Sequence, residues 1–108
     1  MVNQAPNKAF SIRCVWVMER GDLTISDLAT LLDRPRPTVN TWVNGRTPHG
    51  PSGRFAIRRL DLLQDMVRKR HGFPVPEMLA GKQRVEYIQG IRDVVDKHVR
   101  VSPMRATG

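Results

Sequence analysis

Apolar residues recur along this chain in short stretches whose spacing fits one face of a helix. Alternation of polar and apolar residues over strand-length runs is absent, and proline and glycine fall between the helical stretches. The sequence therefore predicts an all-α fold, a compact domain of four to five helices. The predicted helices cover Asn7–Arg20, Ile25–Leu32, Arg36–Asn44, Arg54–Arg70 and Glu77–Arg100.

Residues typical of helix ends separate these stretches. Asn7 is the predicted cap of the first helix, and Thr24 or Ser26 is the predicted cap of the second. Gly45 ends the third helix. Residues 46–53, which are rich in proline and glycine, are predicted to form a loop before the fourth helix.

The predicted organisation has one folded domain with a helical C-terminal extension. Residues 1–6 are expected to be a flexible tail, residues 7–72 the domain, residues 73–100 a helical segment and residues 101–108 a second tail. Gly81 and Gly90 weaken the helix prediction at two points. Whether the C-terminal segment forms one helix or a broken pair stays open.

The most informative stretch is residues 25–44, where two short helices flank a tight turn. Apolar residues at helical spacing predict a core shared by the two helices, and the small Ala29 lets the helices approach closely. The predicted core consists of Leu28, Ala29, Leu32, Val39, Trp42 and Val43. The opposite face of the second helix carries Arg36, Pro37, Asn40, Thr41 and Asn44, none of them acidic.

A helix that presents arginine, asparagine and threonine suits the major groove of DNA. Arginine matches guanine O6 and N7, asparagine matches adenine N6 and N7, and a threonine methyl can pack on thymine. Aspartate or glutamate on this face would repel phosphate. The chain has ten acidic residues and places none of them on this face.

These residues resemble the helix-turn-helix of the Cro/C1-type (XRE-like, lambda-repressor-like) DNA-binding domains. The resemblance covers about residues 8–67 and is carried by Leu28-Ala29, by Val39 and by the run Trp42 to Pro48, which reads W-x-x-G-R-x-P. Asp33 stands where the family usually has glycine, and aspartate tolerates the left-handed backbone that such a turn needs. Arg34 stands where the family usually has an apolar residue.

The resemblance implies a helical domain whose second motif helix reads the major groove, usually as a dimer on two half-sites. The predicted base-reading residues are Arg36, Pro37, Asn40 and Thr41. The predicted phosphate-binding residues are Thr38, Asn44, Arg46, Arg54 and Arg58. The competing interpretation of the basic residues is ordinary solvation, above all for the basic run on the fourth helix, which includes Arg59 and Lys69.

Charge and composition narrow the choice of partner. The 108 residues include 18 Lys and Arg against 10 Asp and Glu, a net charge of +8, which favours nucleic acid first and an anionic membrane second. No run is long and apolar enough to span a membrane, and the layout of a signal peptide is missing, so we expect a cytoplasmic protein.

The sequence gives little support to chemistry at a metal or an active site. A single cysteine, Cys14, lies at a position expected to be buried, and three scattered histidines do not form a metal-binding pattern. Nucleophile–base patterns and phosphate-binding glycine loops are also missing. We therefore expect no cofactor, no metal, no small-molecule substrate and no enzymatic activity.

The C-terminal segment carries an apolar stripe at helical spacing, made of Val85, Ile88, Ile91, Val94, Val95 and Val99. This stripe can pack back on the domain, or it can form a homodimer or higher homo-oligomer through helix packing. A second copy would supply the affinity that a single helix-turn-helix lacks.

Three functions compete. The first is a small transcriptional regulator or repressor that acts as a homodimer on double-stranded DNA. The second is a phage-type DNA-packaging adaptor (terminase small subunit), which also pairs a helix-turn-helix with an oligomerising helix. The third is a helical protein–protein module that does not bind DNA. Oligomer size separates the first two, and retention on DNA at low salt counts against the third.

Overall fold

A computed structural model describes residues 4–69, 75–76 and 78–107, and the side chains of residues 9–69, 75–76 and 78–99. In these residues the backbone forms five helices and no strand, which confirms the all-α prediction. The helices are α1 (Gln4–Gly21), α2 (Ile25–Leu32), α3 (Arg36–Val43), α4 (Gly50–Lys69) and α5 (Gly81–Thr107).

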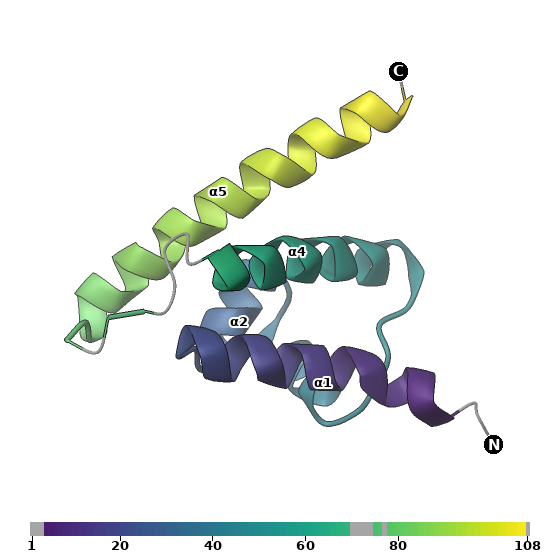
Figure 1. The fold of residues 1–108 in the computed structure, drawn as a ribbon, viewed down its shortest axis with the longest axis horizontal. Helices are drawn as coiled ribbons and strands as arrows, with labels where there is room; N and C mark the ends of the chain where they lie inside the picture. Colours follow the sequence, from purple (N-terminus) through teal and green to yellow (C-terminus); the bar gives the residue numbers. More distant parts are fainter. Residues whose placement is uncertain (1–3, 70–74, 77, 108) are drawn as a thin grey trace.

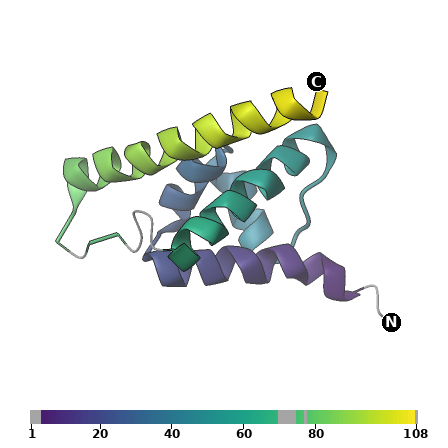
Figure 2. The ribbon, with the colours of Figure 1, turned by 45° about the horizontal axis from the view of Figure 1, so that its top comes forward.

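The helices are stacked around the short α2. Figures 1 and 2 show α2 and α4 between α1 on one side and the long α5 on the other. Helix α3 packs against α1 and α2, whereas α5 packs against α2 and α4. Helix α2 therefore contacts three other helices, α3, α4 and α5.

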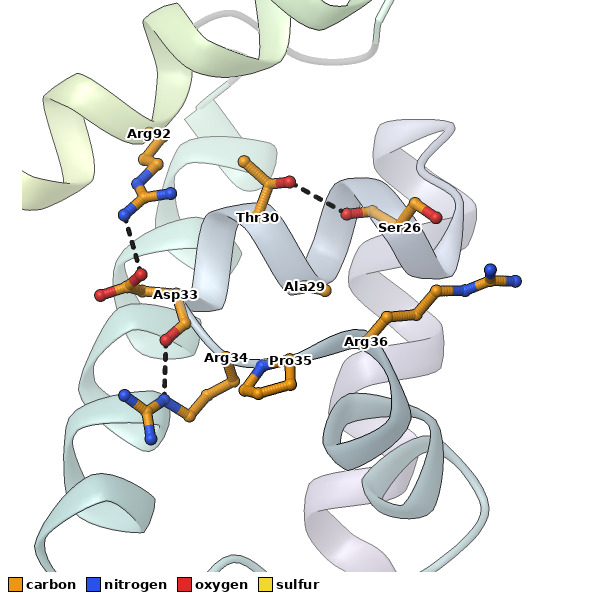
Figure 3. A pocket seen from close by; sticks show the side chains of 8 residues that line it. All are labelled: Ser26, Ala29, Thr30, Asp33, Arg34, Pro35, Arg36 and Arg92. Atoms are coloured by element: carbon orange, nitrogen blue, oxygen red, sulfur yellow. Dashed lines mark hydrogen bonds and ion pairs between the residues drawn. The ribbon is translucent and has the colours of Figure 1, made fainter.

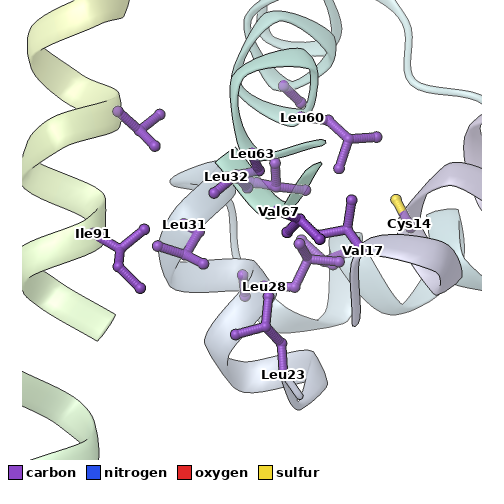
Figure 4. Packing of buried hydrophobic residues seen from close by; sticks show 14 of the residues in the cluster. Cys14, Val17, Leu23, Leu28, Leu31, Leu32, Leu60, Leu63, Val67 and Ile91 are labelled. Atoms are coloured by element: carbon purple, nitrogen blue, oxygen red, sulfur yellow. The ribbon is translucent and has the colours of Figure 1, made fainter. Parts of the chain in front are cut away.

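The core follows from the spacing of apolar residues on each helix. The buried residues are Phe10, Cys14 and Val17 on α1, Ala56, Leu60, Leu63 and Val67 on α4, and Ile88, Ile91, Val95 and Val99 on α5. Helix α2 adds Leu28, Leu31 and Leu32, which are at most 1% exposed. Figure 4 shows Leu31 facing Ile91 of α5, while Leu28 lies on the side of α1 and α4.

Three helix starts differ from the prediction: α1 and α4 begin earlier than predicted, and α5 begins at Gly81, whereas the predicted start, Glu77, lies outside the described residues. Helix α1 begins at Gln4, so residues 4–6 of the predicted tail are helical and Asn7 is not a cap; residues 1–3 lie outside the described chain. Pro6 is compatible with this start because N–H groups of the first turn have no acceptor within the helix. Helix α4 begins at Gly50, four residues before the predicted start at Arg54. The Gly53 N–H donates to the His49 carbonyl at 3.0 Å, which closes a helical turn within the predicted loop.

The C-terminal segment is one helix rather than a broken pair. Helix α5 begins at Gly81, where φ is +57°, and continues through Gly90 to Thr107, so the predicted tail at residues 101–108 is helical up to Thr107. Gly90 does not break the helix because it is exposed and lies inside an intact run of backbone hydrogen bonds. The predicted domain boundary at residues 72–73 lies outside the described residues.

The apolar stripe on α5 packs back on the domain through four of its six residues. Ile88, Ile91, Val95 and Val99 are buried, whereas Val85 is 67% exposed and Val94 is 42% exposed. The packing alternative that the sequence left open is therefore observed for most of the stripe. Oligomerisation stays a prediction.

Arginines of α5 hold both ends of α2. Arg84 donates to Asp27 Oδ2 from Nε at 3.1 Å and from Nη2 at 2.7 Å, and Nη2 also donates to the Asp22 carbonyl at 2.6 Å. The hydrogen bond with Asp27 raises the pKa of Arg84, against the opposing effect of burial. At the other end of α2, Arg92 Nη2 lies 2.8 Å from Asp33 Oδ1.

A pair of glycine substitutions tests the packing at the start of α4. A Cβ at Gly53 would lie 2.8 Å from the Pro48 carbonyl carbon, whereas a Cβ at Gly90 meets nothing within 4 Å. We expect Gly53→Ala to lower the free energy of unfolding by about 1–3 kcal/mol through overpacking. Gly90→Ala should raise it by about 1 kcal/mol because alanine favours the helix. Urea unfolding measures both, and equal effects of the two variants would contradict the close approach at Gly53.

Candidate nucleic-acid interface

Helix α2 is fixed at its start by a reciprocal cap. The Thr24 hydroxyl accepts a hydrogen bond from the Asp27 N–H at 3.1 Å, and the Asp27 carboxylate accepts one from the Thr24 N–H at 2.9 Å. The residue that caps α2 is therefore Thr24 and not Ser26. Two backbone N–H groups that the helix leaves without an acceptor are satisfied in this way.

The turn between α2 and α3 depends on a left-handed residue. Asp33 has φ 57° and ψ 44°, which confirms that aspartate takes the conformation for which glycine is usual. The Arg34 N–H donates to the Ala29 carbonyl at 3.1 Å and closes the turn. Ala29 is 6% exposed beneath it, as expected for a close crossing of the two helices.

Helix α3 is held by the face that carries Val39 and Trp42, which are 0% and 7% exposed. The Trp42 ring meets Phe10 of α1 edge to face, with 5.7 Å between ring centroids. The Ser11 hydroxyl of α1 donates to the Val43 carbonyl at 2.5 Å. The predicted motif core is buried at Leu28, Ala29, Leu32, Val39 and Trp42, and Val43 is half-buried against it.

The outer face of α3 is exposed at all of its predicted groove-facing positions, Arg36, Pro37, Asn40, Thr41 and Asn44. Part of its hydrogen-bonding capacity is already used. The Thr41 hydroxyl donates to the Thr38 carbonyl at 2.6 Å, and the Asn44 amide donates to the Asn40 carbonyl at 2.8 Å.

Arg36 and Asn40 keep their side chains free on this face. Among the residues that the structure describes, neither side chain has a hydrogen bond or an ion pair. These two positions therefore offer the donors best able to meet a base edge, while Thr41 offers chiefly its methyl group.

The predicted phosphate-binding residues differ in how far they are accessible. Arg46 and Arg54 are exposed, at the end of α3 and in the second turn of α4. Thr38 is half-buried and its carbonyl accepts from Thr41. Arg58 is half-buried and engaged within the protein, so it is the least available arginine of this set.

Two arginines that the site prediction omitted lie beside the turn. A depression of about 500 Å³ is lined by Ser26, Ala29, Thr30, Asp33, Arg34, Pro35, Arg36 and Arg92. Figure 3 shows Arg92 reaching from α5 to Asp33, with Arg34 and Arg36 pointing to opposite sides of the turn. Arg34 could be noticed in the sequence because it departs from the family pattern. Arg92 carries no such signal, because it lies on a different helix, 59 residues beyond Asp33.

The interpretation of the basic run on α4 as a solvated face is wrong for Arg59. This side chain is 7% exposed, donates from Nε to the Leu31 carbonyl at 2.8 Å and places Nη2 2.7 Å from Asp96 Oδ1. The sequence could not show this, because the groups that surround Arg59 belong to α2 and α5. Two other charged pairs of α4 lie at the surface, where Asp61 pairs with Arg13 and Asp65 pairs with Lys69.

In the part of the chain that the structure describes, no group of three or more His, Cys, Asp or Glu side chains is placed to hold a metal ion. Burial raises the pKa of the Cys14 thiol to about 12, against a smaller opposing effect of Arg13. A thiol with this pKa is protonated at neutral pH and is a poor nucleophile.

Among the described residues, no helix is both long enough and apolar enough to cross a membrane.

Comparison of the chain with protein-family models, with curated proteins and with solved structures gives no match. The case for a function therefore rests on the residues and geometry above.

Because Cys14 is buried, we expect the stability of the protein to fall at alkaline pH. The thiol has an ordinary pKa of 9.0 in the unfolded chain and about 12 when folded, so unfolded molecules release their proton first. We expect stability to be unaffected by this group below pH 8 and to fall as the pH rises above 9. At pH 10.5 the unfolding free energy should have dropped by about 2 kcal/mol more than that of Cys14→Ala. Urea unfolding of both proteins from pH 7 to 10.5 measures the difference, and parallel curves would contradict the buried thiol.

Proposed function

We propose that this protein binds double-stranded DNA in a sequence-specific manner, as a small transcriptional regulator or repressor that inserts α3 into the major groove. The observation that carries the proposal is the outer face of α3, which is exposed and free of acidic residues and keeps Arg36 and Asn40 unengaged. The opposite face is fixed by buried Val39 and Trp42, so the polar face has a defined orientation.

Base recognition is assigned to the residues on this face. Arg36 lies at the first position of α3 and suits a bidentate contact to guanine, while Asn40, one turn later, suits adenine. The Thr41 methyl can pack on thymine, and the exposed Pro37 lies on the same face at the start of the helix. Occupancy of the site would then block or recruit transcription.

Docking on the DNA backbone is assigned to the cations around α3. Arg46 follows the helix and Arg54 is exposed on α4, and the net charge of +8 favours a polyanion. Arg34 and Arg92 at the turn depression extend the same basic surface. Such contacts make affinity depend on salt. A DNA-binding role of this kind places the protein in the cytoplasm.

We further propose that the protein acts as a homodimer, because one helix-turn-helix has too few contacts for tight binding. The exposed Val94 of α5 lies beside half-buried Leu62 and Met66 of α4, and these side chains line a largely apolar groove of about 470 Å³. This α4–α5 surface is the candidate contact between two copies.

The packaging adaptor is the second candidate, and the length of α5 favours it. Helix α5 has 27 residues, against 20 in α4. A helix of this length is suited to joining subunits in a ring.

Substitution of Arg36 tests the recognition helix. We expect Arg36→Ala to weaken binding by about 1–3 kcal/mol at a site with guanine at one position, and much less at a site that lacks this guanine. Arg20→Ala is the matched control, since Arg20 stacks over Trp16 near the end of α1, far along that helix from its contacts with α3. Fluorescence anisotropy with labelled duplexes measures both. Equal loss on all sequences would make Arg36 a phosphate contact.

Oligomer size and salt dependence test the proposal as a whole. Size-exclusion chromatography with light scattering gives the number of subunits, and a gel shift with random-sequence duplex follows at about 50 and 200 mM salt. A dimer that binds at low salt and releases DNA at high salt supports the regulator. A ring of many subunits supports the packaging adaptor, and failure to bind DNA at either salt contradicts both.

A further inference from the structure

A second hollow adjoins the turn depression, with which it shares Asp33, Arg34 and Arg92 in its lining. It measures about 580 Å³, within the range of sites for small molecules. We call it the α2–α4–α5 pocket. Its walls are Arg34 after α2, Ser52 and Phe55 at the start of α4, and Arg92 with Asp96 on α5.

A buried guanidinium faces this pocket. The Arg59 side chain is only 7% exposed, and its Nη2 pairs with Asp96 Oδ1 at 2.7 Å. Arg59 and Asp96 therefore line the pocket as an ion pair.

The remaining charges of the pocket leave room for one more anion. Three arginines, Arg34, Arg59 and Arg92, face two carboxylates, Asp33 and Asp96, so the pocket has a net charge of +1. Arg34 donates only from Nε, to the Asp33 carbonyl at 2.7 Å, and its terminal nitrogens have no partner among the described residues. Guanidinium groups of this kind suit the paired oxygens of a carboxylate or a phosphate.

Apolar side chains also line the pocket. Phe55 is 49% exposed, and Pro51 and the buried Val99 lie in the same lining. A flat apolar group placed against Phe55 would cover a ring that otherwise faces solvent. The pocket thus pairs an anion site with an apolar surface.

We propose that the α2–α4–α5 pocket binds a small organic anion in which a carboxylate or phosphate is attached to a flat apolar group. The oxyanion would accept from the terminal nitrogens of Arg34, and the apolar group would lie against Phe55. The proposal does not depend on DNA binding. Because Asp33 and Arg34 belong both to the pocket and to the turn before α3, such a ligand is placed to act as an effector of α3.

Binding is tested on the full chain without DNA. Sodium benzoate and phenyl phosphate are titrated into ¹⁵N-labelled protein, and the Nε–H signals of Arg34 and Arg59 are followed by NMR. We expect a saturable shift of both signals with at least one of the two anions, with a Kd of about 1 mM or lower. The stronger of the two identifies carboxylate or phosphate as the preferred group. Benzylamine, which has the ring but a positive charge, should leave both signals unchanged.

Variants separate this pocket from general attraction of anions. Arg34→Gln and Phe55→Ala replace exposed or half-buried side chains and should each weaken binding of the preferred anion at least tenfold. Arg20→Gln removes the same charge from α1 and should leave binding unchanged.

Three results would overturn the proposal. The first is the absence of a saturable shift with either anion up to about 10 mM. The second is equal weakening by Arg34→Gln and Arg20→Gln, which would mean attraction by overall charge. The third is binding of inorganic phosphate as tight as that of phenyl phosphate and unaffected by Phe55→Ala, which would remove the apolar part. Since no DNA is present, these results leave the DNA-binding proposal untouched.

Discussion

The burial of α2 is the constraint on which the rest of the structure depends. A helix of eight residues is unstable in water by itself, because nucleation costs more than so few hydrogen bonds return. Leu28, Leu31 and Leu32 compensate by being almost fully buried, each contributing about 1.5–3 kcal/mol. They achieve this because α2 lies among α3, α4 and α5.

Fixing α2 also fixes the surface proposed to bind DNA. The Thr24–Asp27 cap and Arg84 hold its first turn, and Arg92 holds Asp33 just after its last. The left-handed Asp33 then sets the direction of the chain into α3. Since Val39 and Trp42 are buried on the inner side of α3, its polar side can only face outward. Helix α5 thus supports α2 and the turn that leads into α3, in addition to any role in joining two copies.

The local parts of this arrangement could be predicted from the sequence. The period of the apolar residues located α2 and α3, and the resemblance to a helix-turn-helix placed Asp33 at the turn, where aspartate tolerates left-handed backbone. The core residues Val39 and Trp42 followed from their spacing, because each lies on the same helix as the polar face it supports.

The parts that depend on distant contacts could not be predicted. In the sequence Arg59 looks like a surface arginine, and only its contacts with α2 and α5 show that it is buried. Arg84 and Arg92 pair with Asp27 and Asp33, which lie 57 and 59 residues away in the sequence. Two helix starts were missed at Pro6 and Pro51, which stand in the first turns of α1 and α4, since proline is both a helix breaker and a good early helix residue. The same placement of Pro37 in the first turn of α3 was predicted correctly.

The most direct test of the central claim is an NMR titration of ¹⁵N-labelled protein with random-sequence duplex DNA at low salt. If α2 presents α3 to the major groove, the largest shifts of backbone amides should fall on residues 34–46 and reverse at high salt. Amides near the end of α1, at residues 16–20, should barely move. Shifts that are largest at the end of α1, or spread evenly over all basic segments, would contradict the claim that α3 is the recognition helix.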